Sequence, residues 1–347
     1  MTDEFQSQIF TESAIQRLER FLQARFDNAA AQKIVPLTPD ASTREYFRVG
    51  WDKKTAIACV YPETFSPRSF PYLDVTNLFL TSGLPVAKIL EVNGSLGIIV
   101  HEDFGDRILR PILLTATDDE REPLINQAIK LIANIQVATE RAHSLDSIAS
   151  RLAFDFEKLS WELDFFFKHY FESYSGLVLS PEEAANIKGE LNNVAQELAM
   201  RPRVLCHRDF HAANLMLDRE NRLRIIDHQD ARMGPTSYDL VSLLLDRISE
   251  PPSRVWLREK RMMFLEERRM LGLAPIDPDD FAAEFRLMTI QRCLKAIGTF
   301  SFQTAVRNRA GYVQYIEPMF QVVQRAVESL GRFPHLQKAI RDREQSK

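Results

Sequence analysis

The spacing of apolar residues changes near residue 103, and this change limits the folds open to the chain. Between residues 46 and 100, short apolar runs such as YFRVG, TAIACVY and LGIIV are separated by turn residues, which is typical of β-strands. From about Pro123 onward, apolar residues recur mainly at helical intervals. We therefore predict an α+β, two-lobed fold, with a small strand-rich lobe over residues 1–103 and a large, mostly helical lobe over residues 104–347.

Local signals place several elements within these lobes. Residues 11–26 have helical spacing with Thr11 as a possible N-cap, and a second helix is expected to end at Gly83. The Asn93-Gly94 turn predicts a hairpin, and the HEDFGD segment after that hairpin predicts a connector. Further helices are expected over residues 154–171, after an N-cap at Ser180, after Pro235, Pro252 and Pro278, and in a segment that ends near Leu330.

The composition limits the partners and the compartment. A formal net charge of −4 argues against a protein that coats nucleic acid or an anionic membrane. Cys59, Cys206 and Cys293 are few, odd in number and beside apolar residues, as free thiols are in a reducing compartment. The N-terminus lacks a signal pattern, and no apolar run approaches the roughly 18 residues of a membrane span. We expect a soluble cytoplasmic protein that is a monomer or weak oligomer.

The stretch HRDFHAANLMLDRENRLRIIDHQD, from His207 to Asp230, concentrates the polar chemistry of the chain. Two short apolar runs, LML and RLRII, flank DREN and predict a hairpin with its turn at Glu220-Asn221. In that register Leu217 faces Arg224, Leu215 faces Ile226 and Asn214 faces Asp227. The sequence therefore brings an amide oxygen and a carboxylate to the same end of a two-stranded ribbon.

Asn214 and Asp227 have the oxygen ligands that Mg²⁺ prefers beside substrate phosphates. Asp209 precedes Asn214 by five residues and can accept a hydroxyl proton as a general base. A single Asp-x4-Asn pattern is usually an ordinary polar loop. Its combination with a short hairpin and a following aspartate is far more specific to a phosphoryl-transfer site.

A transition-metal site is the alternative, because His207 and His211 have i, i+4 spacing and His228 is available. Cys206, however, would point away from His207 in a strand. We expect His207 to brace the loop structurally and assign no role to the other two histidines. Asp239 is expected to be structural as well, either in a capping box with Thr236 or as a carboxylate that organises the loop around Asp209.

The motifs HRDFHAANLML and IIDHQD resemble those of the aminoglycoside phosphotransferase and choline kinase family, which is related to the protein kinases. The segments DASTREYFRV, HEDFGD, WELDFFFKHYF, DHQDARMGPTSYDLVSLL and LKAIGTF resemble one branch of it, the anomeric N-acetylmuramate and N-acetylglucosamine kinases of cell-wall (peptidoglycan) recycling. The resemblance covers roughly residues 35 to 335.

This resemblance implies a kinase fold that binds ATP and Mg²⁺ in a cleft, with site residues at matching positions. Asp209 would be the catalytic base, and Asn214 and Asp227 would hold Mg²⁺ against the phosphates. The nucleotide-binding residues would be His101, Glu102 and Asp103 beside adenine, and Ser42, Thr43 and Arg44 over the phosphates.

Two departures from the protein-kinase pattern concern the phosphate site. Residues 38–49 contain no glycine, so Ser, Thr and backbone N–H groups would have to contact the phosphates there. The third strand has Ala58 or Cys59 where kinases place a lysine. We expect Arg44 or Arg48 to supply the missing positive charge.

The acceptor side is expected to be basic. Residues 286–310 contain Arg286, Arg292, Lys295, Arg307 and Arg309 and no acidic residue. If Arg292 and Lys295 bind substrate, the acceptor is neutral or anionic, and a carboxylate such as that of N-acetylmuramate suits arginine. A solvated helix face is the alternative. Asp230 is expected to bind acceptor hydroxyls or only to order its own loop.

Together with these features, the resemblance implies an ATP- and Mg²⁺-dependent kinase that converts an amino sugar to its 1-phosphate. A kinase of another hydroxylated small molecule is an alternative within the same class. A pseudokinase or nucleotide-binding regulator is supported only by the missing lysine and glycines. A zinc-dependent hydrolase would need the histidines to bind metal.

Overall fold

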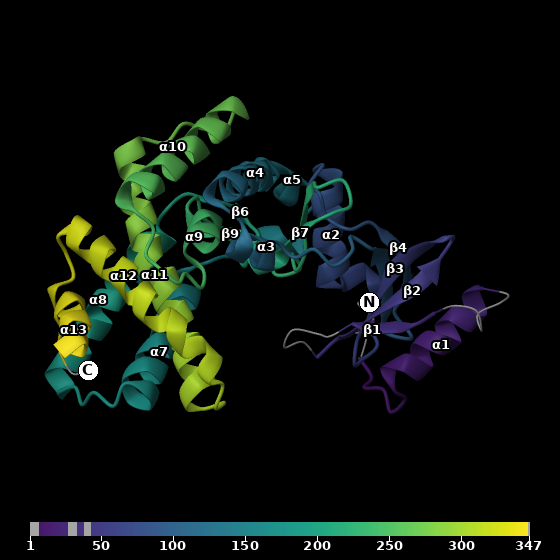
Figure 1. Cartoon of the computed structure of the whole chain (residues 1–347), viewed down its shortest axis with the longest axis horizontal. Coiled ribbons are helices and arrows are strands. Elements are labelled where there is room, and N and C mark those ends of the chain that lie inside the picture. The colour runs from purple at the N-terminus through teal and green to yellow at the C-terminus, as the bar shows by residue number, and fades with distance from the viewer. Residues whose placement is uncertain (1–6, 27–32, 38–42, 346–347) are drawn as a thin grey trace. The chain divides into compact units, whose positions relative to one another are not determined.

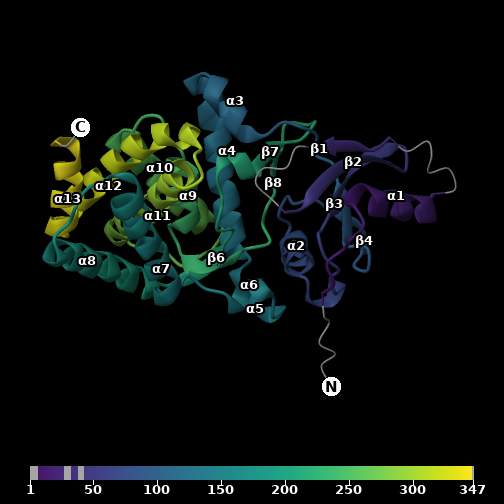
Figure 2. The same cartoon turned by 90° about the horizontal axis from the view of Figure 1, so that it is seen from below.

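The computed structural model describes residues 7–26, 33–37 and 43–345 (Figures 1 and 2). It divides into two compact units. The N-terminal unit comprises Met1–Leu114 together with Ala213–Asp230, and the C-terminal unit comprises Thr115–Ala212 together with Ala231–Lys347. The expected functional division at residue 103 stays a prediction. In the described part of the chain, no helix has the length and apolarity to cross a membrane.

The N-terminal unit contains an antiparallel five-stranded sheet, which confirms the strand-rich character predicted for it. Its order is β1 (Val35–Leu37), β2 (Glu45–Trp51), β3 (Lys54–Val60), β5 (Ile98–Glu102) and β4 (Ile89–Asn93). Strands β2 and β3 are joined at Asp52 and Lys53, which both have positive φ. His101 and Glu102 extend β5 instead of forming part of a connector, because β3 pairs with the strand as far as Glu102.

Helix α1 (Ala14–Arg25) lies along one face of this sheet (Figure 2). Leu18, Phe21 and Leu22 pack with the buried side chains of β2 and β3 in one apolar core. The helix begins after Ser13 and not after Thr11, because Ser13 and Gln16 form a reciprocal capping box.

The remaining elements of this unit connect the sheet to the predicted hairpin. Helix α2 (Pro71–Thr81) is followed by Gly83 at φ 74°, which is the helix end expected from the sequence. Strands β7 (Leu215–Leu217) and β8 (Leu223–Ile225) form the hairpin. It joins the N-terminal unit because the backbone N–H of Leu217 donates to the Arg107 carbonyl at 2.8 Å and that of Ile225 to the Pro85 carbonyl at 3.0 Å.

The C-terminal unit is mainly helical, as predicted. Its helices are α4 (Asp118–Val137), α5 (Thr139–Ser144), α6 (Ile148–Arg151), α7 (Phe156–Phe167), α8 (Pro181–Ala199), α9 (Tyr238–Leu245), α10 (Arg254–Met270), α11 (Pro278–Ala305), α12 (Ile316–Leu330) and α13 (Pro334–Gln345). Helix α3 (Leu109–Thr115) crosses the boundary between the units, and β6 (Arg203–Cys206) pairs with β9 (Arg232–Pro235). The Ser180 N-cap is confirmed, and the helix expected over residues 154–171 is α7 continued by a π-helix over Lys168–Tyr174.

Helix α11 forms the centre of the C-terminal unit, where it packs against α7, α9 and α12 (Figure 1). Asp277 caps it and Pro278 occupies its first turn. Gly298 allows a close approach to α7, since a Cβ at this position would lie 2.6 Å from the Cα of Phe166. The backbones of the two helices are therefore in direct contact, and this contact fixes the position of α11 relative to α7.

Candidate active site

The predicted hairpin is present, but the pairing of its two strands differs by one residue from the predicted register. Leu215 pairs with Ile225 and not Ile226, and Leu217 pairs with Leu223 and not Arg224. The turn is built around Asp218, whose backbone N–H donates to the Arg222 carbonyl at 3.0 Å. The carboxylate of Asp218 also accepts hydrogen bonds from the side chains of Arg222 and Arg224. This local network accounts for the one-residue shift between the predicted and the observed pairing.

The shifted register still brings the two predicted magnesium ligands to one end of the ribbon. The backbone N–H of Ile226 donates to the carbonyl of Asn214 at 3.1 Å, so Asp227 lies one residue beyond the position opposite Asn214. Asp227 has a φ of 61°, and its Oδ1 accepts from Gln229 at 2.8 Å. A carboxylate and a side-chain amide are an appropriate partial ligand set for Mg²⁺, which completes its shell with water and phosphate oxygens.

Arg44 lies beside this end of the ribbon, with its Nη2 3.5 Å from Oδ1 of Asp227. Its guanidinium carbon is 5.8 Å from the ring centre of Tyr46 and 5.9 Å from that of Tyr61. Burial raises the pKa of Cys59 to about 11, and the nearby charge of Arg44 acts in the opposite direction. Arg44 therefore places a positive charge close to Cys59, one of the two positions on β3 where the kinase lysine was expected.

Arg48, the other candidate for this charge, is held elsewhere in the N-terminal unit. Its guanidinium contacts Asp103 at 2.8 Å and Asp106 at 2.7 Å. Thr55 also donates to Asp103 at 2.7 Å. Burial would raise the pKa of Asp103, but these hydrogen bonds lower it below its ordinary value. The side chain of Asp103 is 3% exposed, so its carboxylate serves the structure of the N-terminal unit.

For the other residues expected to bind the nucleotide, the structure gives fewer contacts. The Nδ1 atom of His101 lies 3.0 Å from the carbonyl of Glu102, and burial lowers the pKa of this histidine. Thr43 is exposed, and Ser42 lies outside the described residues. Roles in binding a nucleotide stay predictions for Ser42, Thr43, His101, Glu102 and the backbone of Asp103.

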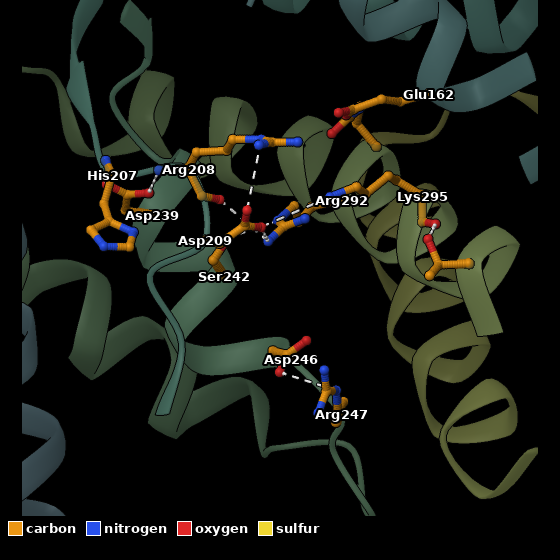
Figure 3. A network of polar contacts seen from close by, with 12 residues as sticks. Glu162, His207, Arg208, Asp209, Asp239, Ser242, Asp246, Arg247, Arg292 and Lys295 are labelled. Atoms are coloured by element: carbon orange, nitrogen blue, oxygen red, sulfur yellow. Dashed lines mark hydrogen bonds and ion pairs between the residues drawn. The ribbon is translucent and has the colours of Figure 1, made fainter. Parts of the chain in front are cut away.

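In the C-terminal unit, the loop that carries Asp209 is organised by Asp239 (Figure 3). The buried carboxylate of Asp239 accepts from the backbone N–H of His207 at 2.6 Å and from that of Arg208 at 3.0 Å. Arg208 has a φ of 86°, a strained value for this residue type. The proposed capping box with Thr236 is wrong, because Ser237 is the N-cap of α9 and the Asp239 carboxylate is used by the loop.

Asp209 lies between positively charged groups (Figure 3). Its Oδ1 is 3.1 Å from Nη2 of Arg292 and 4.0 Å from Nζ of Lys295, and its Oδ2 is 3.7 Å from Nε of Arg208. Burial alone would raise the pKa of Asp209, but the charges of Lys295, Arg292 and Arg208 outweigh it and hold the pKa well below its usual value. The carboxylate is therefore ionised at any physiological pH.

The two basic residues of α11 beside Asp209 differ in how they are held. Arg292 is buried, and its Nε donates to the hydroxyl of Ser242 at 2.7 Å. Burial, and secondly the charge of Arg292, lower the pKa of Lys295 to about 8. The structure thus brings together the predicted base and two residues predicted to bind substrate. The sequence did not predict three other residues around Asp209, Arg292 and Lys295: Ser242, Glu162 and Arg208. For Glu162, the signal was an acidic residue within the apolar WELDFFF run.

The histidines do not form a metal centre. His207 is buried, and its ring meets Phe210 edge-on at 5.6 Å. In the N-terminal unit, Nε2 of His228 lies 2.7 Å from the hydroxyl of Thr76, and burial lowers the pKa of His211 in the C-terminal unit. Across residues 7–26, 33–37 and 43–345, no group of three or more His, Cys, Asp or Glu side chains has the arrangement of a metal site. The zinc-hydrolase alternative therefore lacks support.

Comparison with known proteins gives consistent matches. The model of the phosphotransferase enzyme family matches residues 33–273. The N-acetylmuramate/N-acetylglucosamine kinase of Neisseria meningitidis serogroup B is 30% identical over 263 residues, 76% of either chain. The enzyme of that name from Pseudomonas aeruginosa is 28% identical over 313 residues, 89% of this chain and 88% of the other.

Solved structures share the fold at low sequence identity. Choline kinase from Cryptosporidium parvum superposes with a TM-score of 0.60 at 11% identity, over 94% of this chain and 99% of the other. An ADP-bound aminoglycoside phosphotransferase gives 0.55 at 15% identity, over 88% and 97%. The kinase-like fold class and the family resemblance seen in the motifs are confirmed. The chain therefore belongs to the phosphotransferase enzyme family and is a phosphotransferase with a hydroxyl group as acceptor.

Proposed function

We propose that this protein is an ATP- and Mg²⁺-dependent kinase that phosphorylates the anomeric hydroxyl of N-acetylmuramate or N-acetylglucosamine. The names of the relatives from Neisseria and Pseudomonas support this acceptor class, and the ADP-bound structural neighbour supports a nucleotide as donor. A role in peptidoglycan recycling follows from that acceptor. A cytoplasmic location is part of the proposal, because ATP is available there and the three cysteines are free and buried.

The observation that carries this function is the ionised carboxylate of Asp209 held by Arg292 and Lys295. A hydroxyl that donates to this carboxylate is oriented with one lone pair available for attack. Because the pKa of Asp209 is depressed, the carboxylate is a weak base, and it would take the proton only when the new bond to phosphorus is well advanced. This order suits the loose transition state of phosphoryl transfer.

The reaction forms a bond between the anomeric oxygen and the γ-phosphorus and breaks the bond from that phosphorus to the β-phosphate oxygen. The hydroxyl proton passes to Asp209, and ADP leaves. We assign Asn214 and Asp227 as the residues that hold Mg²⁺, which when bound neutralises charge on the phosphate oxygens. Arg44 adds a fixed positive charge next to Asp227.

The charge around Asp209 favours a neutral or anionic acceptor over a polycation. Arg208, Arg292 and Lys295 all lie within 4.0 Å of the Asp209 carboxylate. A polyamine acceptor would be repelled by this group of charges, whereas a carboxylate such as the lactyl group of N-acetylmuramate would be attracted. Asp230 is half-buried, and its contact with acceptor hydroxyls stays part of the proposal.

Phosphorus NMR of the reaction mixture tests this function directly. The protein is incubated with ATP, Mg²⁺ and N-acetylmuramate or N-acetylglucosamine, and the expected result is a new sugar 1-phosphate signal with stoichiometric ADP. Product only with other hydroxyl acceptors would replace the amino sugar by another substrate class. ATP binding without product from any acceptor in a broad panel would identify a non-catalytic nucleotide-binding protein.

Arg44→Ala is expected to raise the KM for ATP by about tenfold or more, because a charge-assisted contact to phosphate contributes roughly 1.5–3 kcal/mol. Initial rates at varied ATP measure this effect. Lys54→Ala is the matched control, since it also removes one positive charge from the N-terminal unit but at an exposed position on β3. Equal KM values for the two variants would show that Arg44 does not contact the phosphates.

The activity with N-acetylmuramate is expected to fall as the pH rises through about 8. Lys295 is protonated below this pH and neutral above it, so its attraction for the acceptor carboxylate is lost on the alkaline side. Profiles of kcat/KM against pH measure the effect. Lys295→Arg should keep its charge and move the fall to higher pH, and N-acetylglucosamine, which lacks the carboxylate, should show a weaker fall. An unchanged profile in Lys295→Arg would contradict this role.

A further inference from the structure

A second basic site lies in the C-terminal unit, between α10, α11 and α12. These helices line a half-open cavity of about 270 Å³. Five of the described residues that line it are arginines and none is Asp or Glu: Arg254, Arg258 and Arg261 on α10, Arg286 on α11, and Arg325 on α12. Five arginines from three helices thus face one cavity with no acidic residue in its wall.

Among the described residues, two of these five arginines have a hydrogen-bond or ion-pair partner. Arg254 lies 3.8 Å from a carboxylate oxygen of Glu328, and Nη1 of Arg325 donates to the carbonyl of Pro252 at 3.0 Å. Within the described part of the chain, the other three form no hydrogen bond and no ion pair. Three guanidinium groups are therefore available to a ligand in the cavity.

The three unpaired arginines affect one another electrostatically. Burial lowers the pKa of Arg261, and the charges of Arg286 and Arg258 lower it further. Arg258 and Arg261 are three residues apart on α10, so they share one face of the helix, where like charges are destabilising. A multiply charged anion would remove this repulsion, whereas no group of the cavity wall can do so.

The cavity also has an apolar floor. Phe285, Val322 and Ala326 are buried there, and the guanidinium of Arg261 lies 5.1 Å from the ring centre of Phe285. This contact holds one guanidinium over an aromatic ring, which restricts the positions it can take in the cavity. Charged groups above an apolar floor are the arrangement found in sites for small anionic ligands.

We propose that this cavity is a binding site for a free small molecule that carries a phosphate group and at least two negative charges. Guanidinium groups match phosphate oxygens in pairs, and three of them offer enough positive charge for a dianion or trianion. The small volume between the three helices favours a compact phosphate ester or diphosphate. A nucleic acid or a membrane surface is disfavoured, because the recess is small and the whole chain is net negative.

The site differs from the one proposed for phosphoryl transfer. None of its lining residues is among the ion-pair partners of Asp209, which come from Arg208 and from Arg292 and Lys295 further along α11. Helix α11 nevertheless carries residues of both sites, since Thr289 in the cavity wall precedes Arg292 by one turn. Variants of the cavity can therefore be tested without touching the proposed base or its partners.

Isothermal titration calorimetry with inorganic pyrophosphate tests the site, in EDTA so that no divalent metal supports binding elsewhere. The expected result for the unaltered protein is one saturable site, with a Kd at least tenfold higher in Arg261→Gln and in Arg286→Gln. Arg269→Gln is the matched control, since it removes the same charge from the same helix at an exposed position paired with Glu266. It should change the Kd by less than twofold.

Three results would overturn the proposal. The first is no saturable heat at millimolar pyrophosphate. The second is an equal Kd for pyrophosphate in Arg261→Gln and Arg269→Gln. If the binding heat disappeared in Arg44→Ala instead, pyrophosphate would be bound at the nucleotide site. The third is sedimentation with phosphatidylglycerol vesicles that depends on Arg261, which would make a lipid surface the partner. Sugar kinase activity should persist in Arg261→Gln, so failure here and failure of the proposed kinase function are separate outcomes.

Discussion

Asp209→Asn is expected to lower kcat by about 100- to 10,000-fold, the range for loss of a general base. Asparagine has nearly the same shape as aspartate and can still accept from Arg292 through its amide oxygen, but it cannot take up the hydroxyl proton. The KM for ATP should stay within about threefold, because Asp209 is assigned to the acceptor hydroxyl and not to the nucleotide. Initial rates of ADP release at saturating acceptor measure both quantities.

Asp146→Asn provides the matched control for this substitution. Asp146 is an exposed aspartate of the C-terminal unit that pairs with Arg151 at 3.4 Å, so the chemical change is the same while the expected effect on kcat is nil. Thermal unfolding checks that both variants are folded. If the kcat of Asp209→Asn stayed within fivefold of that of the unaltered protein, Asp209 would not be the general base, and the proposed mechanism would be wrong.

Gly298→Ala is expected to destabilise the protein by about 3 kcal/mol, near the upper end of the range for overpacking. The new methyl group would lie 2.6 Å from Cα and 3.0 Å from the backbone nitrogen of Phe166. Backbone atoms cannot move aside as a flexible side chain can, so α11 and α7 must separate. Because Lys295 lies one turn earlier on α11, kcat/KM should fall as well. Urea unfolding measures the stability difference at constant m-value.

Gly189→Ala is the control for this helix–helix contact. Gly189 lies within α8, and a Cβ added there meets no atom within 4 Å. Alanine at that position should raise the free energy of unfolding by about 0.5–1 kcal/mol, because it restricts the unfolded chain and favours the helix. If Gly298→Ala proved as stable as Gly189→Ala, the close contact between α7 and α11 would not exist in solution.

The sequence predicted much of the local structure because local structure follows from local patterns. Apolar runs and turn residues predicted β2, β3, β4 and β5 of the sheet and the hairpin of β7 and β8, whereas the short edge strand β1 was not predicted. Proline and serine signals predicted where α8, α10 and α11 begin. The predicted hairpin register was wrong because the carboxylate of Asp218 accepts several hydrogen bonds across the turn. The spacing of apolar residues cannot indicate such bonds.

The environment of Asp209 was only partly predictable, because it is assembled from residues far apart in the chain. Arg292 and Lys295 were expected near the acceptor from the charge pattern of residues 286–310. Their direct contacts with Asp209 depend on how α11 packs, and no sequence pattern records that packing. For Asp239 the sequence left two structural roles open, because its three-residue spacing from Thr236 fits a capping box as well as a loop anchor, and the structure shows the loop anchor.

The return of Ala213–Asp230 to the N-terminal unit has a consequence for synthesis on the ribosome. At about 5–20 residues per second, roughly 6 to 23 s separate the emergence of residue 114 from that of residue 230. Throughout that interval the carbonyls of Pro85 and Arg107 lack the partners that β7 and β8 later provide. The N-terminal unit therefore cannot be completed as the first product of translation, and its last strands must be added after a long stretch of the C-terminal unit has already emerged.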